Sequence, residues 1–315
     1  MWKKNQNSVP FRSKLTKGKI QENGALLLLA LPALIYFIIW HYVPMFGLVL
    51  AFKDYTYSAG IFGSEWVGFD NFKFFFTSQD ALRITRNTVG YGATFIVLNA
   101  VTAVTAALLL NEVRSRAAIK TYQTIMILPN FLSWVIVGFI TYILLNPSIG
   151  VLNQALELFG IEGKDWYSDP KYWPVILTIA HIWKTIGMNM IMYYAALMGI
   201  NQELYEAAEI DGANALQRCW YISVPELVPL MTMLSILAVG NIFRGDFGLF
   251  YQIPRDVGVL YPTTDVIDTY VYRGLRTGDI GITSAVGLFQ SLVGVTLVMI
   301  TNAIVRKIEP DNAMF

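Results

Sequence analysis

The chain has 315 residues, a formal net charge of +1, 55% hydrophobic residues and only 14% charged residues. Because an average soluble domain is about 25% charged, this composition excludes an ordinary soluble enzyme, and its hydrophobicity excludes intrinsic disorder. A nearly neutral chain has no basic field for nucleic acid, and one cysteine with two histidines makes a Cys/His zinc site implausible. We therefore expect a protein of the lipid bilayer, without a metal site and without a nucleic-acid partner.

Six runs of the sequence are apolar enough to cross a bilayer, which takes about 20 largely apolar residues. In chain order the runs are Gly24–Phe52, Thr88–Leu110, Thr121–Leu145, Tyr172–Ile200, Leu227–Phe243 and Ile280–Val305. Only the fourth run carries a lysine, Lys184, and none carries Asp or Glu. The pattern predicts an all-α fold, a polytopic transmembrane helical bundle with six spans and both termini on one side of the membrane.

Lysine and arginine concentrate in the N-terminal tail, residues 1–23, and in the short turn at 111–120. Because basic residues favour the cytoplasmic side of a membrane, we expect both termini to be cytoplasmic (N-in, C-in). The first run is far longer than the about 7–15 apolar residues of a signal peptide, so we interpret it as a retained span. The predicted organisation is a cytoplasmic tail over 1–23, a six-span domain over 24–305 and a second tail over 306–315.

The connection between the fourth and fifth runs, residues 201–226, is longer than a compact bundle needs. It begins with strong helix formers over 203–209, and Gly212 can end that helix in the left-handed conformation. We expect a second helix over Ala213–Tyr221, followed by Pro225 near the start of the fifth span, where a missing N–H costs little. The loop is therefore predicted to be a helix, a glycine turn and a second helix on the cytoplasmic face.

This loop resembles the EAA loop of the membrane subunits of binding-protein-dependent ABC importers, whose pattern is Glu-Ala-Ala, three residues, Gly, nine residues and Ile-x-Leu-Pro. The matching residues are Glu206, Ala207, Ala208, Gly212, Ile222 and Pro225, and the neighbouring Asp211 and Ala213 fit the carbohydrate-importer version. The chain departs from the pattern at Val224, where the family has Leu and the apolar character is kept. With six runs around the loop, the chain looks most similar to sugar permeases, especially those for complex oligosaccharides.

The resemblance implies the type I ABC importer permease fold (MetI-like) and a transport subunit rather than an enzyme. In the family this loop docks in a cleft of an ATPase subunit, and ATP-driven closure switches the permease between inward-open and outward-open states. The implied partners are a second homologous permease, two ATP-binding cassette ATPases and an extracytoplasmic solute-binding (lipo)protein. The chain has no G-x-x-x-x-G-K-[ST] phosphate loop, so we expect no cofactor in it, with ATP and Mg bound by the partner ATPases.

Polar and aromatic side chains inside the spans are candidates for the substrate path, because polar groups are costly in lipid. The candidates are Lys184, His181, Asn189, Tyr193, Trp183 and Asn241. Lys184 is expected to contact sugar hydroxyls or the carboxylate of an acidic sugar, unless it snorkels or pairs with a partner's carboxylate. Helical spacing places Lys184 and His181 on one face, with Asn189 and Tyr193 on another. For the amides and rings the alternative is packing between helices.

The third outer connection, residues 244–279, offers polar and aromatic side chains to the binding protein, by analogy with the family. These are Asp246, Tyr251, Arg255 and Tyr261, and an ordinary surface loop is the alternative. We predict the permease subunit of a carbohydrate importer, with an oligosaccharide favoured as substrate. The alternatives are a permease for amino acids or phosphate, a secondary transporter, which would show carboxylates in its spans, or an intramembrane enzyme built on Lys184 and His181.

Overall fold

The computed structural model describes residues 17–308. The predicted tails over 1–23 and 306–315 therefore lie largely outside the described residues. Within the described part the regular elements are helices, apart from a short antiparallel hairpin that pairs β1 (Lys53–Asp54) with β2 (Glu65–Trp66). The prediction of an all-α fold is confirmed.

The chain divides into two compact units, and the first of them, residues 1–49, holds one long helical segment. Helix α1 (Lys17–Phe37) passes into a π-turn over Ile38–Tyr42 and then into a 3-10 helix over Val43–Phe52. The described apolar side chains of this segment are mostly exposed, as expected where lipid or a partner subunit forms the surroundings. The stretch Leu26–Phe52 is long and apolar enough to cross a membrane, which agrees with the first predicted run.

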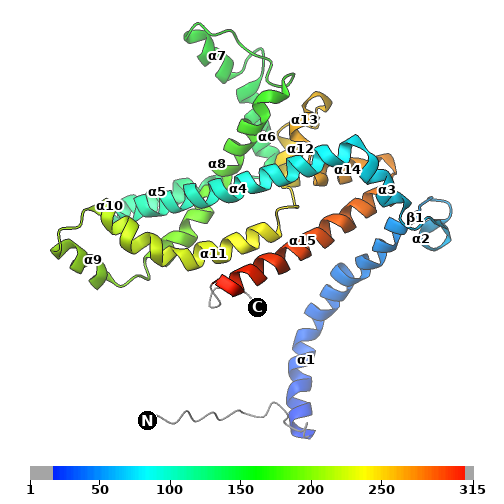
Figure 1. Ribbon diagram of the computed structural model, residues 1–315, viewed down its shortest axis with the longest axis horizontal. Coiled ribbons are helices and arrows are strands. Elements are labelled where there is room, and N and C mark those ends of the chain that lie inside the picture. The colour runs from blue at the N-terminus through cyan, green and yellow to red at the C-terminus, as the bar shows by residue number, and fades with distance from the viewer. Residues whose placement is uncertain (1–16, 309–315) are drawn as a thin grey trace. The chain divides into compact units, whose positions relative to one another are not determined.

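In the second unit, residues 50–315, helices α4 (Gln79–Asn111) and α8 (Trp173–Leu197) pack along one another. Helix α11 (Val224–Gly240) packs on both, and α15 (Ile280–Ile308) packs on α11 (Figure 1). The core shared by α4, α8 and α11 includes Ala103, Ala107, Met190, Tyr193, Leu197 and Leu227. Many apolar side chains on the outer faces of these helices stay exposed, which suits helices surrounded by lipid, where all backbone groups bond within the helix.

The third predicted run, Thr121–Leu145, is not one straight helix. Helix α5 (Arg116–Ile127) and a 3-10 turn over Leu128–Phe131 are followed by α6 (Trp134–Leu145), and the two parts are bent by 97°. A proline lies in the turn, and the Ser133 side chain caps the new helix, so one helix ends and another begins within a few residues. The described residues thus contain five helices able to span a membrane, or six if the bent pair counts as one span.

The fifth predicted run, Leu227–Phe243, begins 12 residues after the start of the span in the structure, Ala215. Helix α10 (Ala215–Arg218), a π-turn over Cys219–Ser223 and α11 join into one candidate span over Ala215–Gly240. Glu226, the charge that ends the uncharged run in the sequence, lies in the first turn of α11 and does not interrupt the helix. The second helix predicted within the loop is therefore the beginning of the span.

Short elements lie toward both ends of these long helices. Figure 1 shows α9 (Gln202–Ile210) at one end of the bundle, with α12 (Phe247–Gln252), α13 (Tyr261–Thr264) and α14 (Ile267–Thr277) toward the other. The remaining short elements are α2 (Gly60–Gly63), α3 (Asp70–Thr77), α7 (Val151–Leu158) and 3-10 turns over Pro170–Tyr172 and Gly258–Leu260. The predicted loop and the predicted third outer connection are therefore separated by the length of the bundle.

Candidate functional site: a helical loop and a cavity between helices

Helix α9 ends in a left-handed glycine turn. Gly212 has a φ of 80° and its N–H donates to the Glu209 carbonyl at 3.0 Å. The Ala213 N–H donates to the Ala208 carbonyl at 2.8 Å, so the last carbonyls of the helix are satisfied in the Schellman pattern. A Cβ at Gly212 would meet no atom within 4 Å, so backbone conformation rather than space requires glycine here. The predicted helix and glycine turn are confirmed.

Two contacts join the loop to α11 as one rigid piece. The Arg218 guanidinium pairs with the Glu209 carboxylate at 2.8 Å, which ties α10 to α9. The Tyr205 hydroxyl bonds Ser223 Oγ at 2.9 Å, which ties α9 to the residue directly before α11. Because α10 is itself continuous with α11, these contacts connect α9 to that span.

The exposed side of the loop carries an unpaired carboxylate and apolar side chains. Glu206 is exposed and forms no ion pair within residues 17–308, whereas Glu209 is held by Arg218. Ile210 is 87% exposed and Leu204 is 47% exposed. Of the other predicted loop residues, Ala207, Asp211 and Pro225 are exposed, and Ala208, Ala213 and Ile222 are half-buried. Exposed apolar side chains grouped beside a free charge are typical of a surface that another protein covers.

A cavity of about 410 Å³ lies among α4, α8 and the end of α11. Its polar lining residues are Asn99, His181, Asn189, Tyr193, Ser235, Asn241 and Arg244. Four of the six predicted substrate-path residues thus line one space. Helical spacing separates His181 from Asn189 and Tyr193, as expected, but the cavity covers about a third of the circumference of α8 and therefore includes all three.

One wall of this cavity is a hydrogen-bonded chain between α4 and α8. The Asn99 amide nitrogen lies 3.0 Å from His181 Nε2, and the Thr185 hydroxyl donates to Asn99 Oδ1 at 3.1 Å. The His181 ring stacks on Phe95, with ring centroids 3.9 Å apart. By contrast, the Asn189 amide makes no side-chain hydrogen bond within the described residues. The wall is therefore fixed in place while the Asn189 amide stays available to a molecule in the cavity.

Lys184 lies away from this cavity. Its ammonium donates to the backbone carbonyls of Asn130 at 2.8 Å and Leu132 at 2.7 Å, at the break before α6. It also lies 5.2 Å from the centroid of the Trp134 ring, and the residue is only 9% exposed. Carbonyls at a helix end lack helical partners, and a buried ammonium needs acceptors. The geometry therefore makes Lys184 a positioning residue of the bent span. Trp183, also predicted for the path, lies on the exposed side of α8 at 43%.

The chain matches, over residues 99–311, the family model described as the inner membrane component of binding-protein-dependent transport systems. The chain belongs to this family. It is 37% identical to the protein LplB of Bacillus subtilis (strain 168), over 95% of this chain and 96% of LplB. It is 35% identical to the polygalacturonan/rhamnogalacturonan transport system permease protein YteP of the same organism, over 92% of this chain and 90% of YteP.

The fold of this permease is also similar to that of a solved transporter. A chain of a bacterial ABC transporter involved in the import of the acidic polysaccharide alginate superposes with a TM-score of 0.85 and 34% identity, covering 93% of this permease and 98% of that chain. A second structure shows the alginate transporter in complex with an alginate pentasaccharide-bound periplasmic protein. The MetI-like type I importer fold is confirmed, and the permease is a multi-pass transport subunit of the cytoplasmic membrane.

Three of the outer residues predicted to touch a binding protein have contacts within the permease itself. Asp246 caps α12 and accepts a hydrogen bond from Trp134 Nε1 at 2.8 Å. The Arg255 guanidinium lies 4.2 Å from the centroid of the Tyr142 ring. Tyr251 and Arg255 line a small pocket of about 230 Å³ between α6 and α12. These side chains therefore shape the surface between α6 and α12, and their contact with a binding protein stays a prediction.

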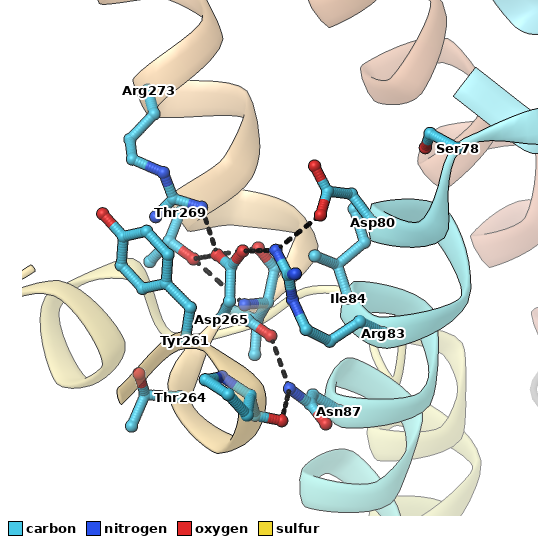
Figure 2. A network of polar contacts seen from close by, with 12 residues as sticks. Ser78, Asp80, Arg83, Ile84, Asn87, Tyr261, Thr264, Asp265, Thr269 and Arg273 are labelled. Atoms are coloured by element: carbon cyan, nitrogen blue, oxygen red, sulfur yellow. Dashed lines mark hydrogen bonds and ion pairs between the residues drawn. The ribbon is translucent and has the colours of Figure 1, made fainter. Parts of the chain in front are cut away.

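The sequence prediction missed a polar network centred on Asp265, which Figure 2 shows. The Asp265 carboxylate is fully buried and pairs with Arg83 at 3.0 Å and with Arg273 at 2.6 Å. Its backbone carbonyl accepts from the Asn87 amide at 2.9 Å. The fourth predicted outer residue, Tyr261, lies with its ring centroid 4.1 Å from the Arg273 guanidinium. The network ties the beginning of α4 to α13 and α14. Because these helices are far from α4 in sequence, no local sequence pattern predicts the network.

Proposed function

We propose that this permease forms one half of the translocation path of an ABC importer for an oligosaccharide. An extracytoplasmic binding protein delivers the sugar, and a second, homologous permease completes the path. Two partner ATPases bind ATP and Mg and drive transport, so this chain holds no cofactor. Both termini and the loop over 201–226 face the cytoplasm.

The geometry of the loop is the observation that carries this proposal. Glu206 and the exposed apolar side chains of α9 are presented on a piece held rigid by the Gly212 turn and the Arg218–Glu209 ion pair. That piece continues into α11, whose far end lines the cavity. A partner that moves α9 can therefore change the shape of the cavity, as alternating access requires.

The cavity and the relatives together support a sugar as the substrate. A site for a polyhydroxyl ligand needs amides and hydroxyls to hydrogen-bond it and ring faces to pack on it. The cavity offers Asn189, Asn241 and Tyr193 for the first task and Phe95 for the second. YteP is named for the transport of polygalacturonan and rhamnogalacturonan, and the matched solved transporter imports alginate.

Co-purification from the native host tests the proposal. The tagged permease is solubilised in mild detergent and its partners are identified for the wild type, for Gly212→Val and for the matched control Gly278→Val. Both glycines are left-handed, with φ of 80° and 93°, and neither has an atom within 4 Å of a Cβ. Valine costs about 1–2 kcal/mol of backbone strain at either position. We expect the wild type and Gly278→Val to retain the ATPase and Gly212→Val to lose it.

Two results would overturn the proposal. In the first, the wild type purifies without an ATPase and moves a solute without ATP. The protein would then not work by the ATP-driven mechanism of the ABC importers. In the second, Gly212→Val and Gly278→Val retain the ATPase equally, which would mean that the loop is a connection and that the ATPase docks elsewhere.

A further inference from the structure

Arg244 is the only permanently charged side chain among the residues that line the 410 Å³ cavity. It follows the end of α11, in a turn where its own N–H donates to the Asn241 carbonyl at 2.8 Å. The residue is exposed, and its guanidinium forms no hydrogen bond, ion pair or ring contact within residues 17–308. A guanidinium that lines a cavity without an ion-pair partner of its own is available to an anionic ligand, which it can hold through charge-assisted hydrogen bonds.

Asp268 is the acid that lines a neighbouring pocket together with Arg244. Its Oδ2 already accepts from the Gly245 N–H at 2.6 Å and from the Gln290 amide at 3.2 Å. Burial raises the pKa of the Asp268 carboxyl, although these two hydrogen bonds and the charge of Arg244 oppose the shift. Since no ion pair joins the two side chains within the described residues, Asp268 leaves the guanidinium open to an anion in the cavity.

We propose that Arg244 binds a carboxylate of the transported oligosaccharide, so that the permease selects acidic sugars, such as uronate oligomers, over neutral ones. This inference rests on the proposed function. A guanidinium holds a carboxylate through two parallel hydrogen bonds, a geometry that an ammonium cannot reproduce. Asn189 and Tyr193 line the same space and supply polar groups for the ring hydroxyls. A neutral sugar offers Arg244 no carboxylate and therefore lacks this charge-assisted interaction.

Uptake by the reconstituted importer tests this selection without any variant. The permease with its co-purified partners is placed in liposomes and supplied with binding protein saturated, in turn, with trigalacturonate, with an alginate trisaccharide, with methyl-esterified trigalacturonate or with galactotriose. We expect ATP-driven uptake of at least one of the two uronates to exceed uptake of the ester and of the neutral sugar by about tenfold or more, the effect of one charge-assisted interaction.

Substitutions then assign the selection to Arg244. Arg244→Gln should lower uronate uptake about ten- to a hundredfold. Arg244→Lys should lower it less, because the charge is kept while the fork of two N–H donors is lost. The matched control is Arg276→Gln, which removes a charge of the same sign from an exposed arginine on α14 that lies against Tyr272 and outside the cavity. It should retain uronate uptake, which excludes an effect of net charge alone.

The possible failures can be told apart. If the complex lacks an ATPase, the proposed function fails and this inference fails with it. If ATP-driven uptake occurs but neutral sugar and ester are carried as well as the uronates, or the binding protein takes neutral sugars alone, the proposed function stands and the acidic selection is overturned. If uronates are selected but Arg244→Gln behaves like Arg276→Gln, the role of Arg244 is overturned.

Discussion

Replacing Lys184 by methionine tests whether this buried lysine holds the bent span in shape. In the wild type the ammonium donates to the carbonyls of Asn130 at 2.8 Å and Leu132 at 2.7 Å. Both carbonyls lie where the span is bent by 97° and helical partners are missing. Methionine fills a similar volume and donates no hydrogen bond, so the change removes the hydrogen bonds while much of the packing stays.

The expected loss follows from the geometry. A hydrogen bond to a charged group contributes about 1.5–3 kcal/mol, so two give about 3–6 kcal/mol, and the Trp134 ring at 5.2 Å adds about 0.5–1 kcal/mol. The cost of burying the ammonium, which is removed together with it, offsets part of this gain. We expect Lys184→Met to lower the free energy of unfolding by about 2–4 kcal/mol.

Thermal unfolding of the detergent-solubilised permease complex measures this effect, with surviving complex counted by size-exclusion chromatography after heating. The matched control is Lys171→Met, which removes the same charge from an exposed lysine whose side chain has no partner within residues 17–308. Surface changes of this kind usually shift stability by about 0.5 kcal/mol or less. The reasoning would be refuted if both variants lost the complex at the same temperature. If Lys184→Met lost sugar uptake while its stability stayed unchanged, Lys184 would instead act in the substrate path.

Three further predictions concern other contacts and use the same unfolding assay. Gly187→Ala should destabilise the complex by about 1–3 kcal/mol, because its Cβ would run into the Met126 carbonyl of α5. Gly90→Ala, with no atom near its Cβ, should be neutral or stabilising by up to about 1 kcal/mol, and equal effects of the two changes would contradict this account. Asp265→Asn should cost about 2–4 kcal/mol, below the value for a fully buried pair because its two arginines keep some solvent access, and an unchanged melting temperature would show the network to be dispensable. For Asp268, burial raises the pKa above the ordinary 3.8, so the folded chain holds this proton more tightly than the unfolded chain does. Its ionisation should therefore lower stability as the pH rises above the ordinary pKa of 3.8, and Asp268→Asn should lack this part of the slope.

The helix and turn at Gly212 could be predicted from the sequence because local residues decide them. Helix formers precede a glycine, and only glycine adopts its left-handed backbone without strain. The break in the third span could be predicted only in part. The sequence shows Pro129 inside the run, but the bend also needs the Lys184 ammonium and the close approach of Gly187, both supplied by α8.

The candidate site, too, could be predicted from the sequence only in part. His181, Asn189, Tyr193 and Asn241 could be named because polar residues stand out in an apolar run, yet the space they share is made by three helices. Arg244 was missed because it lies one residue beyond the predicted end of the fifth run, Phe243, and was counted with the outer connection. Asn241 and Arg244 are three residues apart, and the Arg244 N–H donates to the Asn241 carbonyl in the turn that follows the span. Two polar residues at this spacing directly after an apolar run could have indicated that Arg244 lies beside Asn241 in the site.

Because α10 and α11 form one continuous span, a tilt at the loop end displaces the opposite end of the span. At about 1.5 Å per residue, its 26 residues measure about 39 Å. A tilt of about 5° about the loop end would carry the opposite end sideways by about 3 Å, as much as a hydrogen bond is long. Arg244 lies just past that opposite end. If Arg244 holds a carboxylate of the sugar as proposed, a small rotation imposed at α9 is enough to move the guanidinium away from it. Release of the sugar would then be coupled directly to the movement of α9.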